Sequence, residues 1–574
     1  MRPVNPALSL RLPIGRARVL LALMVLAFLA VAARALYLQG VRTEFLQQEG
    51  ESRYARVLEL PAHRGVIADR NGEPLAISTA MESVWATPAL AKIDRAQRAR
   101  LATLLGVSEG ELKQRLDSER DFVYLKRHLP PEVAERVVQM RLPGISLKRE
   151  YRRYYPAGEV TGHLIGFTDL DDRGQEGVEL AYQARLAGKA GSRRVIQDRL
   201  GRVVEDAEGR RPPVEGQDIH LSIDSRLQYM AYRELKAAVI KHAARAGGIV
   251  VLDVKTGELL ALANLPTYNP NNRTTLTADS ARNRVVTDLF EPGSTLKPFT
   301  VAAALEAHMV KPETTVQTSP GYLMVGSARI SDAHPAGMLT VSQVIQRSSN
   351  VGVAKIALSL PKEQLWGVLS AVGFGVAPHV GFPGEAGGRL RDYQRWRPIE
   401  QATLAYGHGI SVSLLQLARA YSIFATDGSL QPVTLLKHEE PASGVRVLSS
   451  GTAHAVRSML ETVVQPGGTA VRAQVPGYRV AGKTGTAHKL QGASYAGDRY
   501  VSSFVGMAPA SDPRLIVAVM IDEPHKGEYY GGIVAAPVFS AVMAEALRML
   551  RVAPDAPITP SMPVVGPAEA KEEV

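Results

Sequence analysis

The most strongly patterned segment of the chain is a run of apolar residues near its N-terminus. Residues 19–33 are all apolar or small, and Ala35–Leu38 continues the run beyond Arg34. This makes about 20 residues, enough to span a bilayer when Arg34 extends its charged group to the interface. Basic and no acidic residues precede the run, which predicts a cytoplasmic N-terminus over residues 1–18 and a transmembrane anchor over residues 19–40. The basic residues are Arg2, Arg11, Arg16 and Arg18.

A cleaved signal peptide is the alternative interpretation of this segment. Ala30-Val31-Ala32 has the small-x-small form that signal peptidase recognises. The apolar length and the lack of polar residues before that site favour the uncleaved anchor. Under either interpretation the remaining residues, roughly 530, lie outside the cytoplasm.

The part of the chain that follows predicts a mixed α+β module over residues 50–216. Short β-like runs such as Val57–Leu60 occur beside helical ones such as Pro131–Met140, and no single period dominates. A second domain, over residues 217–552, begins near Asp224, which can cap a helix. That helix has an apolar face whose members recur every four residues, namely Leu227, Ala231, Leu235 and Val239.

Four apolar runs within the second domain predict strands, and the first two are joined by a short polar turn that is typical of a hairpin. The expected strands are residues 248–253, 258–263, 502–507 and 515–521. A helix over residues 537–550 follows, with Pro537 at its first position. Strands bracketed by helices at both ends of the domain predict an α/β fold with an antiparallel sheet covered by helices. From Ala553 onward the chain is rich in proline, which predicts a disordered tail over residues 553–574.

The composition excludes several classes of function. Of 574 residues 45% are hydrophobic and 21% are charged, which is typical of a globular multidomain protein. The net charge of +11 is spread along the chain without a block of basic residues, so we expect no nucleic-acid partner. The chain has no cysteine, and none of its 13 histidines lies three or four residues from another. We therefore expect no disulfide, no metal site and no cofactor.

Ser294 and Lys297 are the first candidate catalytic pair. The turn residues Glu291-Pro292-Gly293 precede Ser294, and a helical run over residues 301–308 follows. If a helix begins at Ser294, the two side chains share a face, and an unprotonated lysine can activate a serine nucleophile. Ser359-Leu360-Pro361-Lys362 has the same spacing, but its proline follows a helical run and is expected to end it.

Ser348-Ser349-Asn350 is the second candidate element, at the end of a helical run over residues 341–346. A serine can relay protons, and an amide can donate to a substrate carbonyl while it accepts from a lysine. Taken alone, the tripeptide is as typical of a helix C-cap or a polar turn.

Lys483-Thr484-Gly485-Thr486 is the third candidate element, preceded by the strand-like residues 478–482. On a strand Thr484 and Thr486 face the same side, Gly485 lets a ligand approach the backbone, and a neighbouring lysine can bind a carboxylate. Lys255-Thr256-Gly257 repeats the triplet, but it lies in the predicted hairpin turn, where such residues are ordinary turn chemistry.

These three elements, in this order, form the SxxK, SxN and KTG motifs of β-lactamases and penicillin-binding proteins. The chain resembles a class B penicillin-binding protein of the cell-division type, from the anchor to about Val552. Three stretches resemble the non-catalytic module of that class, and we expect them to form tight turns and buried ion pairs that hold two lobes together. They are Arg64–Gly72, Tyr155–Phe167 and Gly174–Glu179.

The resemblance implies a peptidoglycan D,D-transpeptidase. Ser294 would attack the penultimate D-alanine carbonyl of a stem pentapeptide, release the last D-alanine and pass the acyl group to an amine on a neighbouring stem. Lys297 would act as the base, Ser348 would relay protons, and Asn350 would position the substrate. β-Lactams, which imitate the D-Ala-D-Ala end, would acylate Ser294.

The resemblance also assigns the third motif. Lys483, Thr484 and Thr486 would hold the terminal carboxylate, and Gly485 lies among them. The backbone N–H groups of Ser294 and Thr486 would form the oxyanion hole. The asparagine of the second motif favours the division type, because elongation-type relatives commonly carry an aspartate there. His488 stands where division enzymes usually place Lys or Arg, with Lys489 beside it.

Three rival functions remain open. A class A β-lactamase needs a glutamate four residues before an asparagine, and no asparagine follows Asn350. A bifunctional wall synthase needs a glycosyltransferase domain, for which the region before the second domain leaves little room. A non-catalytic drug sensor would become acylated and stop there. The expected location is the bacterial inner membrane with the catalytic domain in the periplasm, and the expected partners are a septal glycan polymerase and other division proteins.

Overall fold

The computed structural model describes residues 13–43, 55–197, 203–206, 210–438, 440, 443–491 and 494–557. Its first element is the long apolar helix α1 (Ile14–Leu36), which continues into the π-helical turn η2 (Tyr37–Val41). Within Ile14–Val41 an 18-residue window has a mean hydropathy of 2.6, and none of the residues in that window is buried in the protein. The predicted apolar helix is confirmed, and by length and composition it can cross a membrane. Arg2 and Arg11 lie outside the described residues.

The chain divides into two compact units that do not follow chain order. The first contains residues 1–62, 80–150 and 189–215, and the second contains residues 63–79, 151–188 and 216–574. The second unit thus takes two segments from the region that the sequence assigns to the non-catalytic module. The domain boundaries that the sequence predicts at residues 18, 40, 216 and 552 remain a prediction.

The first unit contains a three-stranded antiparallel sheet and a small helical core. The sheet has the order β1 (Ala55–Leu60), β6 (Gly191–Gln197) and β7 (Val203–Asp206), which confirms the predicted strand at Val57–Leu60. The core packs helices against β4 (Val123–Leu129) through buried side chains such as Leu101, Leu112 and Val137. The helices are α3 (Arg95–Leu105), α4 (Glu109–Leu116) and α5 (Pro131–Gln139).

The second unit contains a buried ion cluster built from the motif stretches of the sequence. Arg64 Nε donates to Glu179 Oε2 at 2.7 Å, and Arg153 Nε donates to Glu179 Oε1 at 2.6 Å. The side chains of Arg64, Arg153 and Glu179 are at most 1% exposed. The sequence predicts ion pairs that join two lobes, but all three residues belong to one unit. Sequence reasoning also missed Arg153, which shares the carboxylate.

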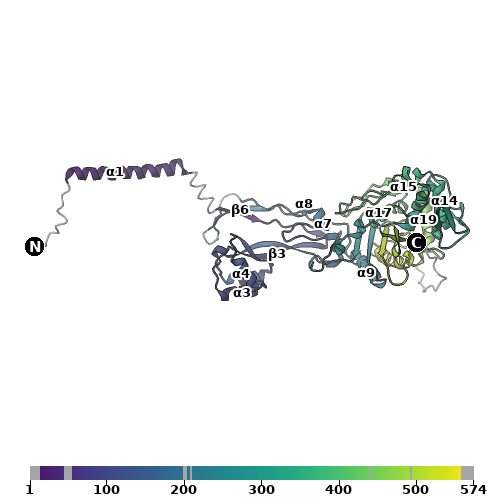
Figure 1. Ribbon diagram of the computed structural model, residues 1–574, viewed down its shortest axis with the longest axis horizontal. Coiled ribbons are helices and arrows are strands. Elements are labelled where there is room, and N and C mark those ends of the chain that lie inside the picture. The colour runs from purple at the N-terminus through teal and green to yellow at the C-terminus, as the bar shows by residue number, and fades with distance from the viewer. Residues whose placement is uncertain are drawn as a thin grey trace. The chain divides into compact units, whose positions relative to one another are not determined.

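A five-stranded antiparallel sheet forms the centre of the second unit (Figure 1). Its strands lie in the order β10 (Leu259–Leu265), β9 (Ala246–Asp253), β19 (Leu515–Asp522), β18 (Ser494–Ala508) and β17 (Ala481–Gln491). All residues of β9, β10 and β19 are buried, because helices cover both faces. The predicted strands and the antiparallel sheet are confirmed.

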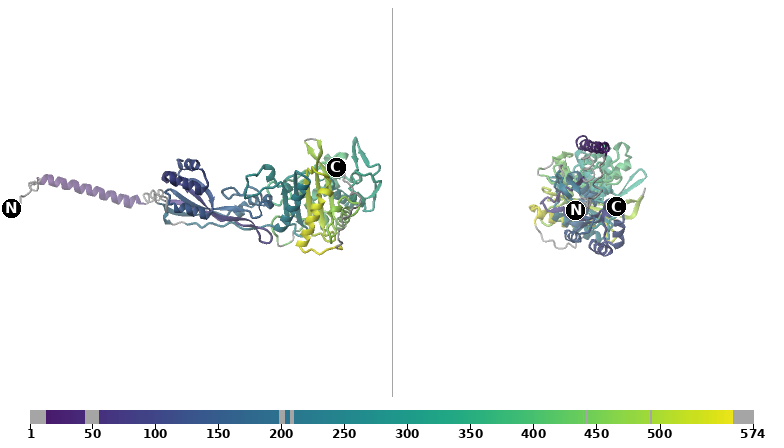
Figure 2. Two further views of the ribbon diagram at one scale, coloured as in Figure 1. Left: turned by 90° about the horizontal axis from the view of Figure 1, so that it is seen from below. Right: turned by 90° about the vertical axis from the view of Figure 1, so that its left-hand side faces the viewer.

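Two adjacent glycines of β9 show how closely the helices approach these faces. A Cβ atom on Gly247 would lie 2.9 Å from Val239 of α9 (Ser225–Lys241), and one on Gly248 would lie 3.0 Å from Val285 of α11 (Arg284–Thr287). Neighbouring residues of a strand point to opposite faces, so α9 and α11 lie on opposite sides of the sheet. Helix α21 (Ala536–Met549) packs beside α9 and is drawn in yellow in Figure 2.

The remaining elements of the second unit surround this sheet. Its other helices are α6 (Gly162–Ile165), α7 (Gly177–Ala181), α8 (Gln183–Leu186), α10 (Ala278–Ala281), α12 (Lys297–Glu306), α13 (Val341–Gln346), α14 (Asn350–Ser359), α15 (Lys362–Ala371), α16 (Pro398–Leu404), α17 (Leu414–Ala420), α18 (Ser422–Ala425), α19 (Ser450–Val464) and α20 (Gly531–Val534). Its short strands are β2 (Ile67–Ala68), β8 (Ile219–His220), β11 (Thr315–Gln317), β12 (Tyr322–Val325), β13 (Ala328–Ser331), β14 (Met338–Thr340), β15 (Ser429–Leu430) and β16 (Val445–Arg446). Two longer strands, β3 (Pro74–Ala86) and β5 (Ile145–Tyr154), contribute residues to both units.

Two expectations about the edges of elements are wrong. Residues 478–480, expected to be strand-like, precede β17, which begins at Ala481. The tail is ordered at its start, because Asp555 accepts hydrogen bonds from Arg479 N at 2.7 Å and from Ser511 Oγ at 2.7 Å. A short acceptor side chain thus fixes residues that composition alone assigns to disorder. Residues 558–574 of the predicted tail lie outside the described residues.

Candidate active site

The first candidate pair lies on a tight turn that enters α12. Ser294 belongs to the 3-10 helix η5 (Gly293–Leu296), and Lys297 is the first residue of α12. The sequence predicts that the helix begins at Ser294, whereas the α-helix begins three residues later. Side chains three residues apart eclipse each other in a 3-10 helix, so the shared face of Ser294 and Lys297 stays a prediction. Pro298 lies in the first turn of α12, as expected.

Close backbone packing fixes the turn that carries Ser294. Gly293 has φ +56°, and a Cβ atom on Gly407 would lie 2.2 Å from the Gly293 carbonyl oxygen. Tyr421 donates its phenolic hydrogen to the Thr295 carbonyl at 2.7 Å. The turn is therefore held from two sides, and Ser294 is only 4% exposed.

Ser348 brings the three motifs together. Lys297 Nζ donates to Ser348 Oγ at 2.9 Å and also contacts the Ser348 carbonyl oxygen. Lys483 Nζ donates to the same Oγ at 2.9 Å. Ser348 has φ +62°, a left-handed conformation that a residue other than glycine rarely adopts. Such backbone strain is typical of functional sites, where the surrounding structure enforces it.

The two lysines are completely buried around this hydroxyl. Lys297 and Lys483 both have 0% exposed surface. Burial disfavours an ammonium ion, and a second ammonium bonded to the same oxygen disfavours it further. A neutral amine beside a serine hydroxyl can accept a proton, so the arrangement is suited to general-base chemistry.

The third motif lies on β17, which is the last strand in the order of the central sheet. A Cβ atom on Gly485 would lie 2.9 Å from the Pro292 carbonyl oxygen and 2.9 Å from Thr295 Cγ2. The sequence predicts that a ligand approaches Gly485, and the structure adds that the turn carrying Ser294 packs against this glycine. The absence of a side chain at Gly485 thus lets β17 pack against η5.

The two threonines of the motif are buried and hydrogen-bonded. The Thr484 hydroxyl lies 2.8 Å from that of Thr469 and 3.3 Å from Lys483 Nζ. The Thr486 hydroxyl accepts from Gly531 N at 3.1 Å. Thr469 was not identified from the sequence, since it belongs to none of the motifs.

Asn350 is the first residue of α14 and starts a new helix after the short break that follows α13. Its amide nitrogen donates to the Ser331 carbonyl at 3.3 Å. Ser349 caps α14 by accepting from Gly352 N at 2.9 Å. The tripeptide therefore forms the junction of two helices and includes an N-cap, where the sequence also allowed a C-cap or a turn.

The second Ser-x-x-Lys sequence and the second Lys-Thr-Gly sequence lie outside this site, as predicted. Ser359 is the last residue of α14, and its hydroxyl donates to the Ile356 carbonyl at 2.7 Å. Lys255 follows β9 in the hairpin turn, and its amine pairs with Asp512 at 3.1 Å. Within the described parts of the chain, no group of three or more His, Asp or Glu residues could hold a metal ion.

Comparisons with known proteins agree with this arrangement. Residues 247–544 match the model of the penicillin binding protein transpeptidase domain, and residues 59–221 match that of the penicillin-binding protein dimerisation domain. The chain is 43% identical to the "Probable peptidoglycan D,D-transpeptidase PenA" of Neisseria gonorrhoeae over 95% of this chain and 94% of that protein. It is 41% identical to the "Peptidoglycan D,D-transpeptidase FtsI" of Escherichia coli K12 over 93% of this chain and 91% of that protein.

A solved structure is also similar. The transpeptidase domain of penicillin-binding protein 3 from Burkholderia pseudomallei is 52% identical, with a TM-score of 0.55, and covers 59% of this chain and 98% of its own. The chain belongs to the penicillin-binding protein transpeptidases. It is a serine-type peptidoglycan D,D-transpeptidase that cross-links stem peptides.

One residue near the nucleophile of this transpeptidase was not found from the sequence. His408 follows Gly407, which packs on Gly293. Burial lowers the pKa of His408 to about 4, and the nearby Lys297 and His488 act in the same direction. The flanking glycines of Tyr406-Gly407-His408-Gly409 are visible in the sequence, but no fixed spacing connects them with the three motifs.

The pair His488-Lys489 departs from the division-type pattern, and the structure separates the two residues. The ring of His488 lies against Tyr500 with 4.7 Å between centroids. Lys489 Nζ pairs with Asp522 at 2.8 Å and with Glu523 at 2.6 Å. Lys489 is thus bound to two carboxylates, and we expect His488 to be the one that faces the substrate.

The partly buried His408 should make the native state less stable in acid. An unfolded histidine titrates near pH 6.5, and the folded pKa is lower, so the unfolded state binds the proton first as pH falls from about 6.5 to about 4. The stabilisation is complete above this interval and falls by at most about 1.4 kcal/mol per pH unit within it. His408→Asn should therefore make the acid slope of urea unfolding shallower. His308→Asn, at an exposed position, should leave it unchanged. Equal slopes for wild type and His408→Asn would contradict the assignment.

Proposed function

We propose that this transpeptidase cross-links peptidoglycan at the division septum, with Ser294 as the nucleophile. The observation that carries the residue roles is the single Ser348 hydroxyl shared by Lys297 and Lys483 beside the nucleophile turn. The septal role is supported by the similarity to the FtsI protein of Escherichia coli and by the asparagine of the second motif.

In the acylation step, Ser294 Oγ bonds to the penultimate D-alanine carbonyl carbon while its proton passes to Lys297 Nζ. The carbonyl oxygen becomes an oxyanion that accepts from the backbone N–H groups of Ser294 and Thr486. One such donor typically contributes about 10²–10³ in rate. This pairing of donors is supported by the close contact between η5 and β17 at Gly293 and Gly485, which are the residues before Ser294 and Thr486. The C–N bond then breaks, and the leaving D-alanine nitrogen takes a proton through Ser348.

Recognition of the donor peptide is assigned to the third motif and to Asn350. Lys483, Thr484 and Thr486 hold the terminal carboxylate, which an ammonium and two hydroxyls can bind. Asn350 positions the substrate amide. In the second half-reaction an acceptor amine attacks the acyl ester and restores the Ser294 hydroxyl. A β-lactam enters by the first half-reaction and stays attached.

Covalent labelling tests the nucleophile. Ser294→Ala should abolish labelling by a fluorescent penicillin, because the attacking oxygen is missing. Ser359→Ala is the matched control, since Ser359 has the same spacing to a lysine and is the last residue of α14. Its labelling should equal that of the wild type in gel fluorescence and in mass spectrometry of the adduct. Labelling that survives Ser294→Ala would refute the assignment.

The two lysines should respond differently to replacement by arginine. A guanidinium does not deprotonate in proteins, so Lys297→Arg should lower the penicillin acylation rate by about 10²-fold or more. Lys483→Arg keeps the charge at the carboxylate subsite and should mainly weaken binding. Stopped-flow acylation over a range of penicillin concentrations separates the rate from the binding constant. Near-normal acylation by Lys297→Arg would make Ser348 the first alternative base.

We also propose a single-pass location in the inner membrane, with a cytoplasmic N-terminus and a periplasmic catalytic unit. The support is the apolar span Ile14–Val41, with Arg16 and Arg18 in its first turns. A septal glycan polymerase and other division proteins are the proposed partners, by analogy with the division-type class.

A reporter fusion tests this orientation. An enzyme that is active only in the periplasm, fused after Val574, should be active, because a single span places the two ends on opposite sides. The full-length chain should stay in the membrane fraction at high salt. A soluble product lacking about 32 N-terminal residues would instead indicate signal cleavage.

A further inference from the structure

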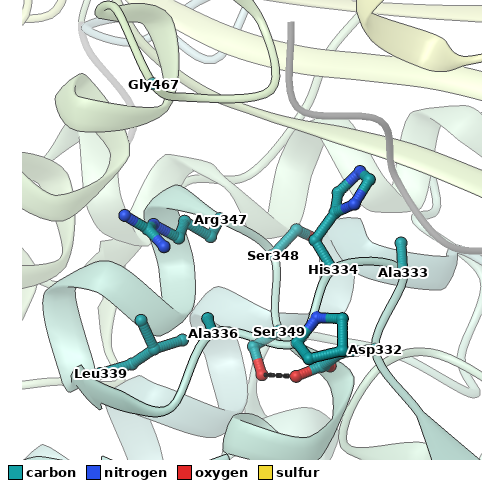
Figure 3. A pocket seen from close by; sticks show the side chains of 10 residues that line it. Asp332, Ala333, His334, Ala336, Leu339, Arg347, Ser348, Ser349 and Gly467 are labelled. Atoms are coloured by element: carbon teal, nitrogen blue, oxygen red, sulfur yellow. Dashed lines mark hydrogen bonds between the residues drawn. The ribbon is translucent and has the colours of Figure 1, made fainter. Parts of the chain in front are cut away.

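A cavity of about 220 Å³ opens beside Ser348, on the side of the second motif. Figure 3 shows its lining, with Arg347 and His334 on either side of the view and the Ser349–Asp332 hydrogen bond below them. The complete lining is Asp332, Ala333, His334, Pro335, Ala336, Leu339, Arg347, Ser348, Ser349 and Gly467. Ser348, whose hydroxyl binds Lys297 and Lys483, therefore also lines this cavity.

The reaction requires space at the acyl carbon on Ser294, within reach of the proposed relay Ser348. The acyl ester forms when the D-alanine nitrogen leaves, and it is consumed when an acceptor nitrogen attacks the same carbon. The second step is the first in reverse, so the entering nitrogen takes the position that the leaving nitrogen had. A leaving D-alanine is small, whereas an acceptor amine belongs to a whole stem peptide. The rest of the acceptor must extend beyond the subsite of the leaving group.

The charges of the cavity indicate which acceptor groups it binds. Asp332 is already engaged at the start of α14, where it accepts from Ser349 Oγ at 2.6 Å and from Val351 N at 2.9 Å. Arg347 is exposed, and among the described residues the structure gives its guanidinium no carboxylate partner. The charge that remains available is thus positive. A guanidinium binds carboxylates through two parallel hydrogen bonds.

We propose that this cavity is the acceptor subsite and that Arg347 binds a carboxylate of the acceptor peptide. The proposal rests on the proposed roles of Ser294 and Ser348. The acceptor nitrogen bonds to the acyl carbon, and the ester bond to Ser294 Oγ breaks. The proton lost by the nitrogen returns to Oγ through Ser348 and Lys297. Arg347 takes no part in proton transfer and acts as a specificity-determining residue.

The test separates the two half-reactions. The full-length protein in detergent is acylated by a D-Ala-D-Ala donor peptide and offered the tripeptide alanyl-γ-glutamyl-diaminopimelate. A second acceptor differs only in having the glutamyl α-carboxylate amidated. For the wild type, the cross-linked product measured by mass spectrometry should form faster with the free carboxylate. Arg347→Gln should lower kcat/KM for that acceptor by about tenfold or more and should remove the preference. Arg347→Glu should reverse it.

Controls distinguish the possible outcomes. Penicillin acylation needs no acceptor, so it should stay near the wild-type rate in both Arg347 variants. This result would show that the variants are folded and that their donor half-reaction is intact. Arg395→Gln removes an exposed arginine of the 3-10 turn η6 (Tyr393–Arg395) and should change neither half-reaction. An equal loss for both acceptors, or none, would overturn the acceptor subsite. If penicillin did not acylate the wild-type protein, the proposed function itself would be refuted.

Discussion

Two buried amines that share one hydroxyl form the constraint on which the rest of this site depends. Lys297 comes from α12, Lys483 from β17 and Ser348 from the break between α13 and α14. Two ammonium ions cannot occupy this position without a large desolvation and repulsion cost. The structure therefore favours a state with at least one neutral amine. In the proposed mechanism the neutral amine of Lys297 accepts the proton of Ser294.

This arrangement is maintained by backbone packing more than by side-chain contacts. Gly407 approaches Gly293, and Gly485 approaches Pro292, so the nucleophile turn is enclosed between two segments of backbone. A methyl group at any of these contacts would have to displace main-chain atoms. Preorganisation of this kind lowers the entropic cost of reaching the attack geometry. It also explains how the turn that carries Ser294 is well defined, with Ser294 almost fully buried.

Much of this structure could be predicted from the sequence, and the failures have a common cause. Local patterns predicted α9 through its cap at Asp224, the hairpin of β9 and β10, and the three motifs with their two false repeats. All of these features depend on residues that are close together in the sequence. His408, Thr469 and Arg153 depend on segments far apart in the chain, and one sequence gives no spacing for such contacts. The contact of Gly485 with Pro292 was missed for the same cause.

The position of β17 at the end of the sheet adds a further consequence. A terminal strand exposes backbone donors and acceptors on one side, which is a liability in most proteins and a binding surface in some. Here the nucleophile turn packs against the strand around Gly485. Beyond Thr486 the side chain of His488 packs on Tyr500 of β18, whose ring stacks on Tyr529 at 3.9 Å. His488 lies opposite Tyr500 in the β17–β18 register, so these aromatic contacts stabilise the strand from the side that faces β18.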